Sequence, residues 1–412
     1  MKSAFATLAI AGVVSAGPNN GRAHGRPDGK LDNDQAFINF QGKFNKHYKS
    51  VDESKMRQDI YHKAQAAIDA QNRKTAESGN PMGLKLKMNF TGDMTPEEYH
   101  QMMGLASGHE DKAVTLGKGG RSSNGHGRHL AAENVDWANS GYMGPVKNQG
   151  GCGSCVQFAV SSSVEGTLAI QAGGATQHFS EQHLMDCTYG NDYYAADMKA
   201  DLIARNKDLF GKVYGGFGCG GSWMEYTYDF LREHGAVDVS KKTYTATESL
   251  CEHNASDIVA KATAYGQVTG TVEDLKNVVR NKPVTVAINA SSTAFQYYDS
   301  GVITADQCTT SLNHAVVVVG FNVTGDEVDP SPGPDPEPQP PVDCQVTKWW
   351  HTCPESNARR LQSNPPNANY WRIQNSWSSN WGDNGFVLFD MVDGDGVCGI
   401  NKVVEWADMA YV

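Results

Sequence analysis

The spacing of apolar and polar residues predicts helices in two places along the chain. Between residues 37 and 72, side chains that recur every three or four positions fall on one helical face. These residues are Glu53, Arg57, Tyr61, Ala64, Ile68 and Asn72. A second helix is predicted to begin at Cys155, because apolar residues recur every four positions over 156–168. We expect the pair Gly173-Gly174 to end this buried helix.

Strand-like runs follow in the C-terminal half of the chain. They are "PVTVAI" at 283–288, "HAVVVVGF" at 314–321 and "NYWRIQNSW" at 369–377. A helix-rich part followed by a strand-rich part indicates an α+β fold.

Two stretches interrupt this pattern and are interpreted as insertions. Residues 188–218 are polar and rich in aromatic residues, whereas 325–368 begin with the polyproline-like "DPSPGPDPEPQPP". The aromatic insertion either packs on itself as a small surface subdomain or extends a binding surface. Upstream, residues 104–133 are rich in Gly, Ser and His without periodicity, as in an exposed linker.

The first residues have the pattern of a secretory signal peptide. Met1-Lys2 is followed by a short apolar run and then by Val14-Ser15-Ala16, so we expect a signal peptide over residues 1–16. The alternative is a buried N-terminal helix. No apolar run approaches the ~20 residues of a membrane helix. The formal net charge of −11 among 412 residues argues against a nucleic-acid partner, which requires a clustered basic face.

The nine cysteines include a closely spaced pair, Cys152 and Cys155. This pair could be a redox dithiol, half of a zinc site, or a structural cysteine beside a nucleophile. A dithiol of the thioredoxin kind needs a βαβ context, and zinc needs a second ligand pair. The nearest cysteines stand alone, and His183 has no partner three to five residues away. In an oxidising compartment, an odd count leaves one thiol free.

The third interpretation requires a thiolate, a base and an orienting group. The first turn of a helix favours the thiolate of Cys155, because the positive end of the helix dipole lowers the pKa of a thiol. His314 in "LNHAVVVVGF" could act as its base, and Asn375 in "IQNSWSSNWGDNGF" could orient the imidazole. Gln149 could donate to an oxyanion together with the backbone N–H of Cys155.

These motifs together resemble the papain-like cysteine proteases, the family of papain and cathepsins L and S. The resemblance covers roughly residues 134–410 and rests on "VDWANSGYMGPVKNQGGCGSC", "FSEQHLMDC", "GCGGSW", "NHAVVVVGF" and "QNSWSSNWGDNGF". The helical face around Glu53 and Asn72 has the spacing of the ERFNIN motif of the family's pro-segment. His314 and Asn375 lie 159 and 220 residues after Cys155, more than is usual for the family, and the two insertions account for most of the excess.

The resemblance implies a fold of two lobes, one mainly helical and one strand-rich and barrel-like, preceded by a helical pro-segment. It assigns Cys155 as nucleophile, His314 as general base and acid, Asn375 as imidazole orienter and Gln149 as oxyanion donor. Further residues are implied in substrate binding: Gly220, Gly221, Ser222, Trp223, Met224, Ala287, Leu312, Ala315, Trp377, Trp381 and Val403. Trp377 should also shield the His314–Asn375 hydrogen bond.

The resemblance also implies the cysteine pairing. The expected disulfides are Cys152–Cys219, Cys187–Cys251 and Cys308–Cys398, with Cys344–Cys353 inside the second insertion. Cys155 then remains free. The chain departs from the family at Val156, where an aromatic residue is usual, and at Gln157, where Ala is usual. We expect these changes to alter packing under the helix, not the chemistry.

The implied organisation is a signal peptide at 1–16, a pro-segment at 17–103 that is helical from about residue 34, a linker at 104–133 and a peptidase domain at 134–412. Maturation is expected near residues 127–133. We expect a secreted or lysosomal endopeptidase that uses no cofactor and no metal and contacts no membrane. Its partners would be protein and peptide substrates and its own pro-segment, and it would be a monomer. The alternatives are a catalytically silent homologue and a thiol–disulfide oxidoreductase.

Overall fold

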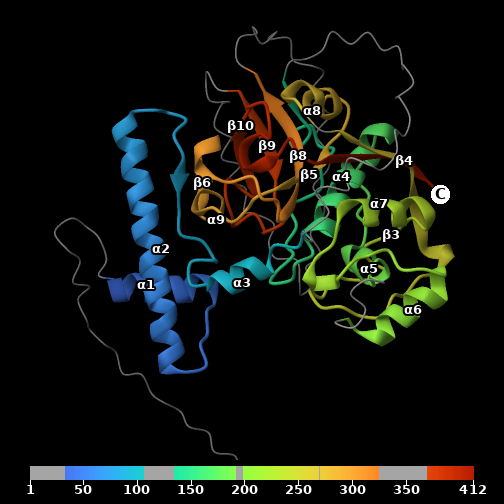
Figure 1. Cartoon of the computed structure of the whole chain (residues 1–412), viewed down its shortest axis with the longest axis horizontal. Helices are drawn as coiled ribbons and strands as arrows, with labels where there is room; N and C mark the ends of the chain where they lie inside the picture. Colours follow the sequence, from blue (N-terminus) through green and yellow to red (C-terminus); the bar gives the residue numbers. More distant parts are fainter. Residues whose placement is uncertain (1–32, 106–133, 192–197, 269, 324–368) are drawn as a thin grey trace, which may run out of the picture. The chain divides into compact units, whose positions relative to one another are not determined.

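The computed structural model describes residues 33–105, 134–191, 198–268, 270–323 and 369–412 (Figure 1). By its internal contacts the chain divides into two parts. The first part ends at His62, and the second begins at Lys63. Among the described residues, no helix is long and apolar enough to cross a membrane.

The helices of the described residues are α1 Asn33–Phe44, α2 Val51–Ser78, α3 Pro96–Gln101, α4 Cys155–Ala172, α5 Glu181–Cys187, α6 Ala200–Phe210, α7 Met224–Glu233, α8 Val272–Val279 and α9 Thr293–Gln296. The strands are β1 Lys85–Leu86, β2 Val135–Asp136, β3 Ala236–Val237, β4 Ile258–Val268, β5 Val284–Ile288, β6 Tyr298–Ser300, β7 Val302–Ile303, β8 His314–Asn322, β9 Tyr370–Gln374, β10 Phe386–Asp390 and β11 Val404–Tyr411.

The first part contains α1 and the N-terminal half of α2. Phe37 and Phe40 of α1 pack on Tyr61 of α2, with ring centroids 5.4 Å and 4.9 Å apart. The predicted helical region is therefore two helices. Asn45 separates them at φ +50°, a left-handed conformation that Asn tolerates better than most residues.

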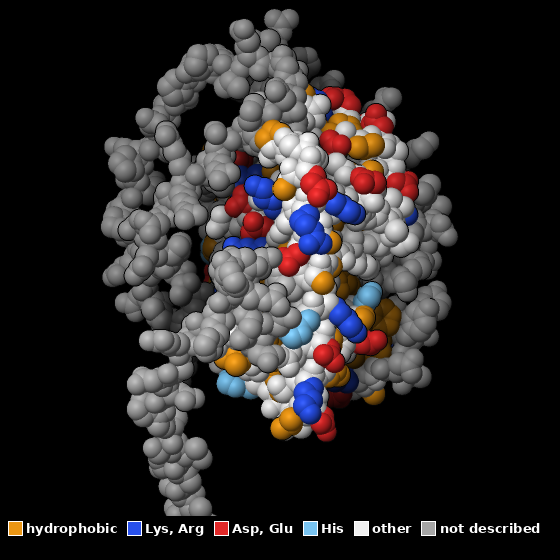
Figure 2. All heavy atoms as spheres, turned by 90° about the vertical axis from the view of Figure 1, so that its left-hand side faces the viewer, with side chains coloured by type: hydrophobic (Ala, Val, Ile, Leu, Met, Phe, Trp, Pro, Cys, Tyr) orange, Lys and Arg blue, Asp and Glu red, His pale blue; other side chains and the backbone are white. Residues whose placement is uncertain are grey.

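The C-terminal half of α2 belongs to the second part and uses the predicted face. Ala64 and Ile68 are buried there. One turn further, the Asn72 carboxamide exchanges two 2.8 Å hydrogen bonds with the backbone of Leu86 in β1. The outer side of α2 carries charges of both signs, and Figure 2 shows Lys, Arg, Asp and Glu side chains interspersed on this side of the molecule.

The central sheet has the strand order β3-β4-β11-β5-β8-β9-β10-β7, and β2 also pairs with β8. The alternation along β8 divides its side chains between two apolar cores. Val316 and Val318 enter the core of the strand-rich lobe, whereas Ala315, Val317 and Val319 enter the core of the helical lobe. The strand therefore lies between the two lobes, and His314 stands at its first position.

The helical lobe is built on α4, which is buried over most of its length because most of its side chains are small or apolar. Gly173 ends the helix at φ +61°, as predicted from the glycine pair. In Figure 1, α5, α6 and α7 lie on the side of α4 away from β9 and β10. The α+β class and the two-lobed architecture are confirmed.

The first insertion packs against the helical lobe. Tyr189 is buried with residues of α6. Phe210 and Tyr214 both meet Phe230 of α7, with ring centroids 5.4 Å and 5.3 Å apart. These aromatic side chains thus serve internal packing. Tyr193, Tyr194 and the second insertion, with Cys344 and Cys353, lie outside the described residues.

Candidate active site

Cys155 is the first residue of α4 and is fully buried. Its Sγ accepts hydrogen bonds from two backbone N–H groups, those of Gly104 at 3.3 Å and Ala315 at 3.4 Å. Ala315 directly follows His314, so the second bond brings the sulfur next to the start of β8. Cys155 is the free cysteine among the described residues.

His314 and Asn375 come together because β8 and β9 are antiparallel neighbours. His314 Nε2 lies 2.9 Å from Asn375 Oδ1, which also accepts the N–H of Ser376 at 2.8 Å. Since Oδ1 accepts, Nε2 donates, and Nδ1 is the unprotonated nitrogen of the neutral ring. Nδ1 has no partner among the described residues. The centroids of the Trp377 ring and the imidazole lie 5.1 Å apart, and both side chains are fully buried.

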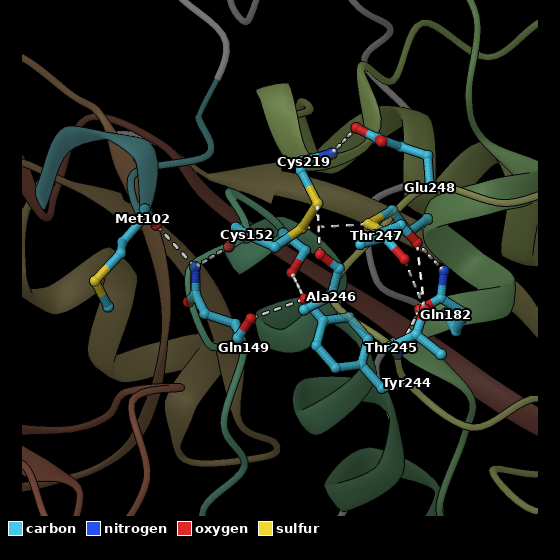
Figure 3. The surroundings of a disulfide bond; sticks show 12 residues. Met102, Gln149, Cys152, Gln182, Cys219, Tyr244, Thr245, Ala246, Thr247 and Glu248 are labelled. Carbon is cyan, nitrogen blue, oxygen red and sulfur yellow. Dashed lines mark hydrogen bonds between the residues drawn. A yellow bond between two sulfur atoms is a disulfide. The ribbon is translucent and has the colours of Figure 1, made fainter. Parts of the chain in front are cut away.

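The Gln149 side chain is fixed at both ends of its carboxamide. Nε2 donates to the carbonyls of Met102 at 2.8 Å and Cys152 at 2.9 Å (Figure 3). Oε1 accepts the hydroxyl of Ser376 at 2.6 Å. Sequence reasoning did not single out Ser376, although its position directly after Asn375 was a usable signal.

Residues 102–105, directly after α3, cover this site. The Gly104 carbonyl accepts Ser222 N–H at 2.8 Å, and Leu105 N–H donates to Asn313 at 3.1 Å. Gly104 approaches so closely that a Cβ there would lie 1.6 Å from the Gly153 carbonyl oxygen. Gly104 and Leu105, the first two residues of the predicted linker, are thus part of the covering segment.

Leu105 belongs to the apolar core of the helical lobe. Its members include six of the residues that the resemblance implied in substrate binding, namely Trp223, Met224, Ala287, Leu312, Ala315 and Val403. Gly221 and Ser222 form the wall that meets Gly104, next to Gly220. Trp381 lies on the other side, 5.4 Å from Trp377, and its Nε1 donates to Gln296.

Comparisons with known proteins agree with this arrangement. Residues 131–407 match the model of the "Papain family cysteine protease" family, and residues 37–99 match the "Cathepsin propeptide inhibitor domain (I29)". The chain belongs to the papain family of cysteine proteases. It is a cysteine endopeptidase with an inhibitory propeptide.

Among curated papain-family relatives, digestive cysteine proteinase 3 of Homarus americanus is 30% identical over 373 residues, which cover 89% of this chain and 92% of the relative. Cathepsin L2 of Homo sapiens is 27% identical, with coverage of 87% and 88%. The solved digestive procathepsin L 3 of Tenebrio molitor superposes with a TM-score of 0.66 at 26% identity, covering 92% of this chain and 99% of that one.

The disulfide bonds decide between the three interpretations of the Cys152 and Cys155 pair. Cys152 is bonded to Cys219, which excludes both a Cys152–Cys155 dithiol and a zinc site that uses the two thiolates. The other predicted bonds, Cys187–Cys251 and Cys308–Cys398, are also present.

Burial sets the protonation of the papain-family site in its covered state. It raises the pKa of Cys155 to about 11, although backbone N–H groups oppose the shift, and it lowers the pKa of His314 to about 4. The thiol and the imidazole are therefore both neutral near pH 7. The expectation that the helix dipole favours a thiolate is wrong for this state, because desolvation exceeds the effect of the helix terminus.

Two further features of the molecule are not part of the Cys155 site. Gln157 is fully buried, and its carboxamide atoms have no hydrogen-bond partner among the described residues; we find no physical account for this residue. A cavity of about 370 Å³ lies between α2 and β7, lined by Lys74, Met82 and Val302, and it shares no residue with the surroundings of Cys155.

Proposed function

We propose that Cys155, His314, Asn375 and Gln149 carry out peptide-bond hydrolysis in this cysteine protease. The observation that supports this most directly is the convergence of a free thiol, an imidazole with an unpartnered Nδ1 and a carboxamide that fixes Nε2. These are the nucleophile, base and orienting group of a thiol protease.

The mechanism follows from these positions once residues 102–105 leave. His314 Nδ1 takes the proton of Cys155, and the thiolate attacks the substrate carbonyl carbon. Negative charge then develops on the carbonyl oxygen, where Gln149 Nε2 and the Cys155 N–H donate. The imidazolium protonates the departing amine, and water attacks the acyl-enzyme with His314 as base, which restores the thiol.

Adduct mapping tests this assignment. The full chain is processed, treated with an epoxysuccinyl thiol-protease inhibitor and digested for mass spectrometry. We expect one adduct on Cys155 with complete loss of peptidase activity. A processed protein that is labelled at Cys155 but never hydrolyses peptides would instead identify the silent binding homologue.

Substrate preference is proposed from the six cluster residues that the resemblance implied in substrate binding. Their side chains are uncharged, so an acidic or basic substrate side chain would be buried there without a partner. We therefore propose hydrophobic residues two positions before the cleaved bond. A peptide library that shows Arg or Glu preferred at that position would contradict this proposal.

Latency is proposed to arise from residues 102–105. The Met102 carbonyl occupies the donor of Gln149, and Gly104 lies over Cys155. We propose that activation follows cleavage within the linker, near residues 127–133, in a secretory or lysosomal setting that the signal peptide at 1–16 would provide. We also propose that the protein acts as a monomer. Full activity of a protein that begins at Gly17 and remains uncleaved would refute the latency.

A further inference from the structure

The two oxyanion donors stand at opposite ends of one loop. Gln149 contributes its side chain, and Cys155 contributes its N–H at the start of α4. Catalytic donors of this kind must hold their mutual position within about 0.5 Å. The middle of the loop is anchored, because Cys152 is bonded to Cys219 (Figure 3). Gly153 N–H also donates to the Cys219 carbonyl at 3.0 Å.

The two ends of the loop are joined through one hydroxyl, that of Tyr244. Tyr244 Oη donates to the Gln149 carbonyl at 2.9 Å and lies 2.5 Å from Ser154 Oγ. A tyrosine has a single hydroxyl proton, and a carbonyl can only accept. Ser154 is therefore the donor to Tyr244, and a directed chain runs from Ser154 through Tyr244 to Gln149.

Ser154 gives up its usual role for this contact. It is the N-cap residue of α4, where a serine hydroxyl ordinarily accepts an N–H of the first turn. Here its side chain makes no such cap. The hydroxyl adjacent to the nucleophile is thus directed to Tyr244 and not to its own helix.

Tyr244 is itself held in place. Its ring stands edge-on to Phe158 of α4, with centroids 4.7 Å apart at 88°. The next residue, Thr245, donates its N–H to the Gln182 side chain at 2.8 Å. Burial raises the pKa of Tyr244, so the hydroxyl keeps its proton over the range in which enzymes work.

We propose that Tyr244 is a positioning residue for the oxyanion site: its hydroxyl ties the Gln149 end of the loop to the Cys155 end. The proposal rests on the proposed roles of Cys155 and Gln149. Tyr244 touches neither the substrate nor the thiol in this role, and its effect passes through the Gln149 carbonyl and the Ser154 hydroxyl.

The test compares reactions that do and do not need an oxyanion site. Tyr244→Phe keeps the ring and removes the hydroxyl. In the full chain after processing, we expect kcat for peptide hydrolysis to fall at least about tenfold with KM nearly unchanged. The affinity for a peptide aldehyde, whose adduct places an oxyanion in the site, should fall by a similar factor.

Alkylation of Cys155 by iodoacetamide places no charge on that oxygen, so its rate should stay within about twofold of wild type. The matched control is Tyr228→Phe, which removes another buried tyrosine hydroxyl, one that contacts Thr285 away from the loop. We expect all three measurements on the control to stay within about twofold.

Ser154→Ala provides a second variant in case Tyr244→Phe does not fold, because it removes the donor to Tyr244 and should change the three measurements in the same directions. The proposal is overturned if a folded variant matches wild type in all three, or if alkylation falls as much as hydrolysis. Wild-type protein that stays active with Cys155 fully alkylated would instead overturn the proposed function itself.

Discussion

The chemistry of Cys155 depends on whether residues 102–105 are in place. In the covered state the sulfur is buried beneath Gly104, and burial raises the pKa of its thiol to about 11. An ordinary cysteine, with a pKa of 9.0, would carry about 100 times more thiolate at pH 7.

This pKa predicts the reactivity of the full chain. At pH 7 we expect iodoacetamide to modify Cys155 in the uncleaved protein at least about 100-fold more slowly than an unperturbed thiol. The same protein unfolded in urea without reductant is the control and should react rapidly. Equal rates before and after processing would show that residues 102–105 do not cover the thiol.

A second residue-scale prediction concerns N-glycosylation at Asn-X-Ser/Thr sequences. The carboxamides of Asn89 and Asn289 are hydrogen-bonded in the interior, and Asn322 is only 7% exposed. Asn254 is exposed. In a eukaryotic secretory host, we therefore expect a glycan on Asn254 among these four. Peptide mass mapping after enzymatic deglycosylation in ¹⁸O water checks this, and a glycan on Asn289 of the folded enzyme would contradict it.

At the scale of elements, α4 and α5 are joined by a buried ion network. Lys147, in the segment before α4, donates to Glu165 of α4 at 2.6 Å and also to Glu181 of α5. All three side chains are buried. Burial alone would raise the pKa of Glu165, but the Lys147 ammonium lowers it, so the carboxylate is charged in the folded protein.

Lys147→Met should therefore destabilise the protein by about 3–5 kcal/mol, because it removes the buried ammonium that Glu165 and Glu181 share. Urea denaturation measures the change. Lys85→Met, at an exposed position, is the control and should stay within about 0.5 kcal/mol. If the buried carboxylates cause the destabilisation, adding Glu165→Gln and Glu181→Gln to the Lys147→Met variant should restore part of the lost free energy of unfolding.

Glu405 of β11 makes stability depend on pH in a known direction. Burial, with the nearby carboxylates of Glu225 and Asp229, raises the pKa of Glu405 well above its usual value. In the unfolded chain the Glu405 carboxyl loses its proton near pH 4.5, whereas in the folded protein it keeps the proton above that pH. Stability is therefore retained below that pH and is lost as pH rises toward the folded pKa.

Glu405→Gln should remove this dependence. We expect its Tm to exceed that of wild type by at least about 2 °C at pH 7 and to match it at pH 4. Thermal unfolding at the two values measures the difference, with exposed Glu252→Gln as the control. A variant that is stabilised equally at both values would mean that Glu405 does not titrate in this range.

Several elements were predictable because one physical signal decided them. The helix at Cys155 and the strand at His314 follow from apolar spacing. The break at Asn45 was missed because the helical period continues across it. The aromatic insertion stayed ambiguous, since aromatic side chains serve cores and binding surfaces equally well. Tyr244 could not be predicted to act near Gln149, because polar contacts between residues distant in sequence leave no local pattern. Ser376 was missed although it directly follows Asn375.

At the scale of the whole molecule, close packing of backbone on backbone fixes the covering segment. A Cβ on Gly104 would collide with the Gly153 carbonyl. Gly104→Ala should therefore loosen residues 102–105 and give the uncleaved chain at least about tenfold faster alkylation of Cys155. Gly42→Ala, which faces open space, is the control. An unchanged alkylation rate of Cys155 in Gly104→Ala would show that residues 102–105 do not cover the thiol in solution.

The contacts of residues 85–105 have a consequence for how activity begins. β1 pairs with β6, Tyr99 donates to the Ala290 carbonyl at 2.7 Å, and Gly104 lies over Cys155. A cut between 106 and 133 breaks none of these bonds. It only converts a tethered inhibitor into a separate molecule, whose effective concentration falls from the millimolar range of a short tether to its actual concentration. The cleaved protein should therefore become active on dilution, because the pro-segment fragment then dissociates. At high protein concentration it should stay inhibited until the fragment is degraded.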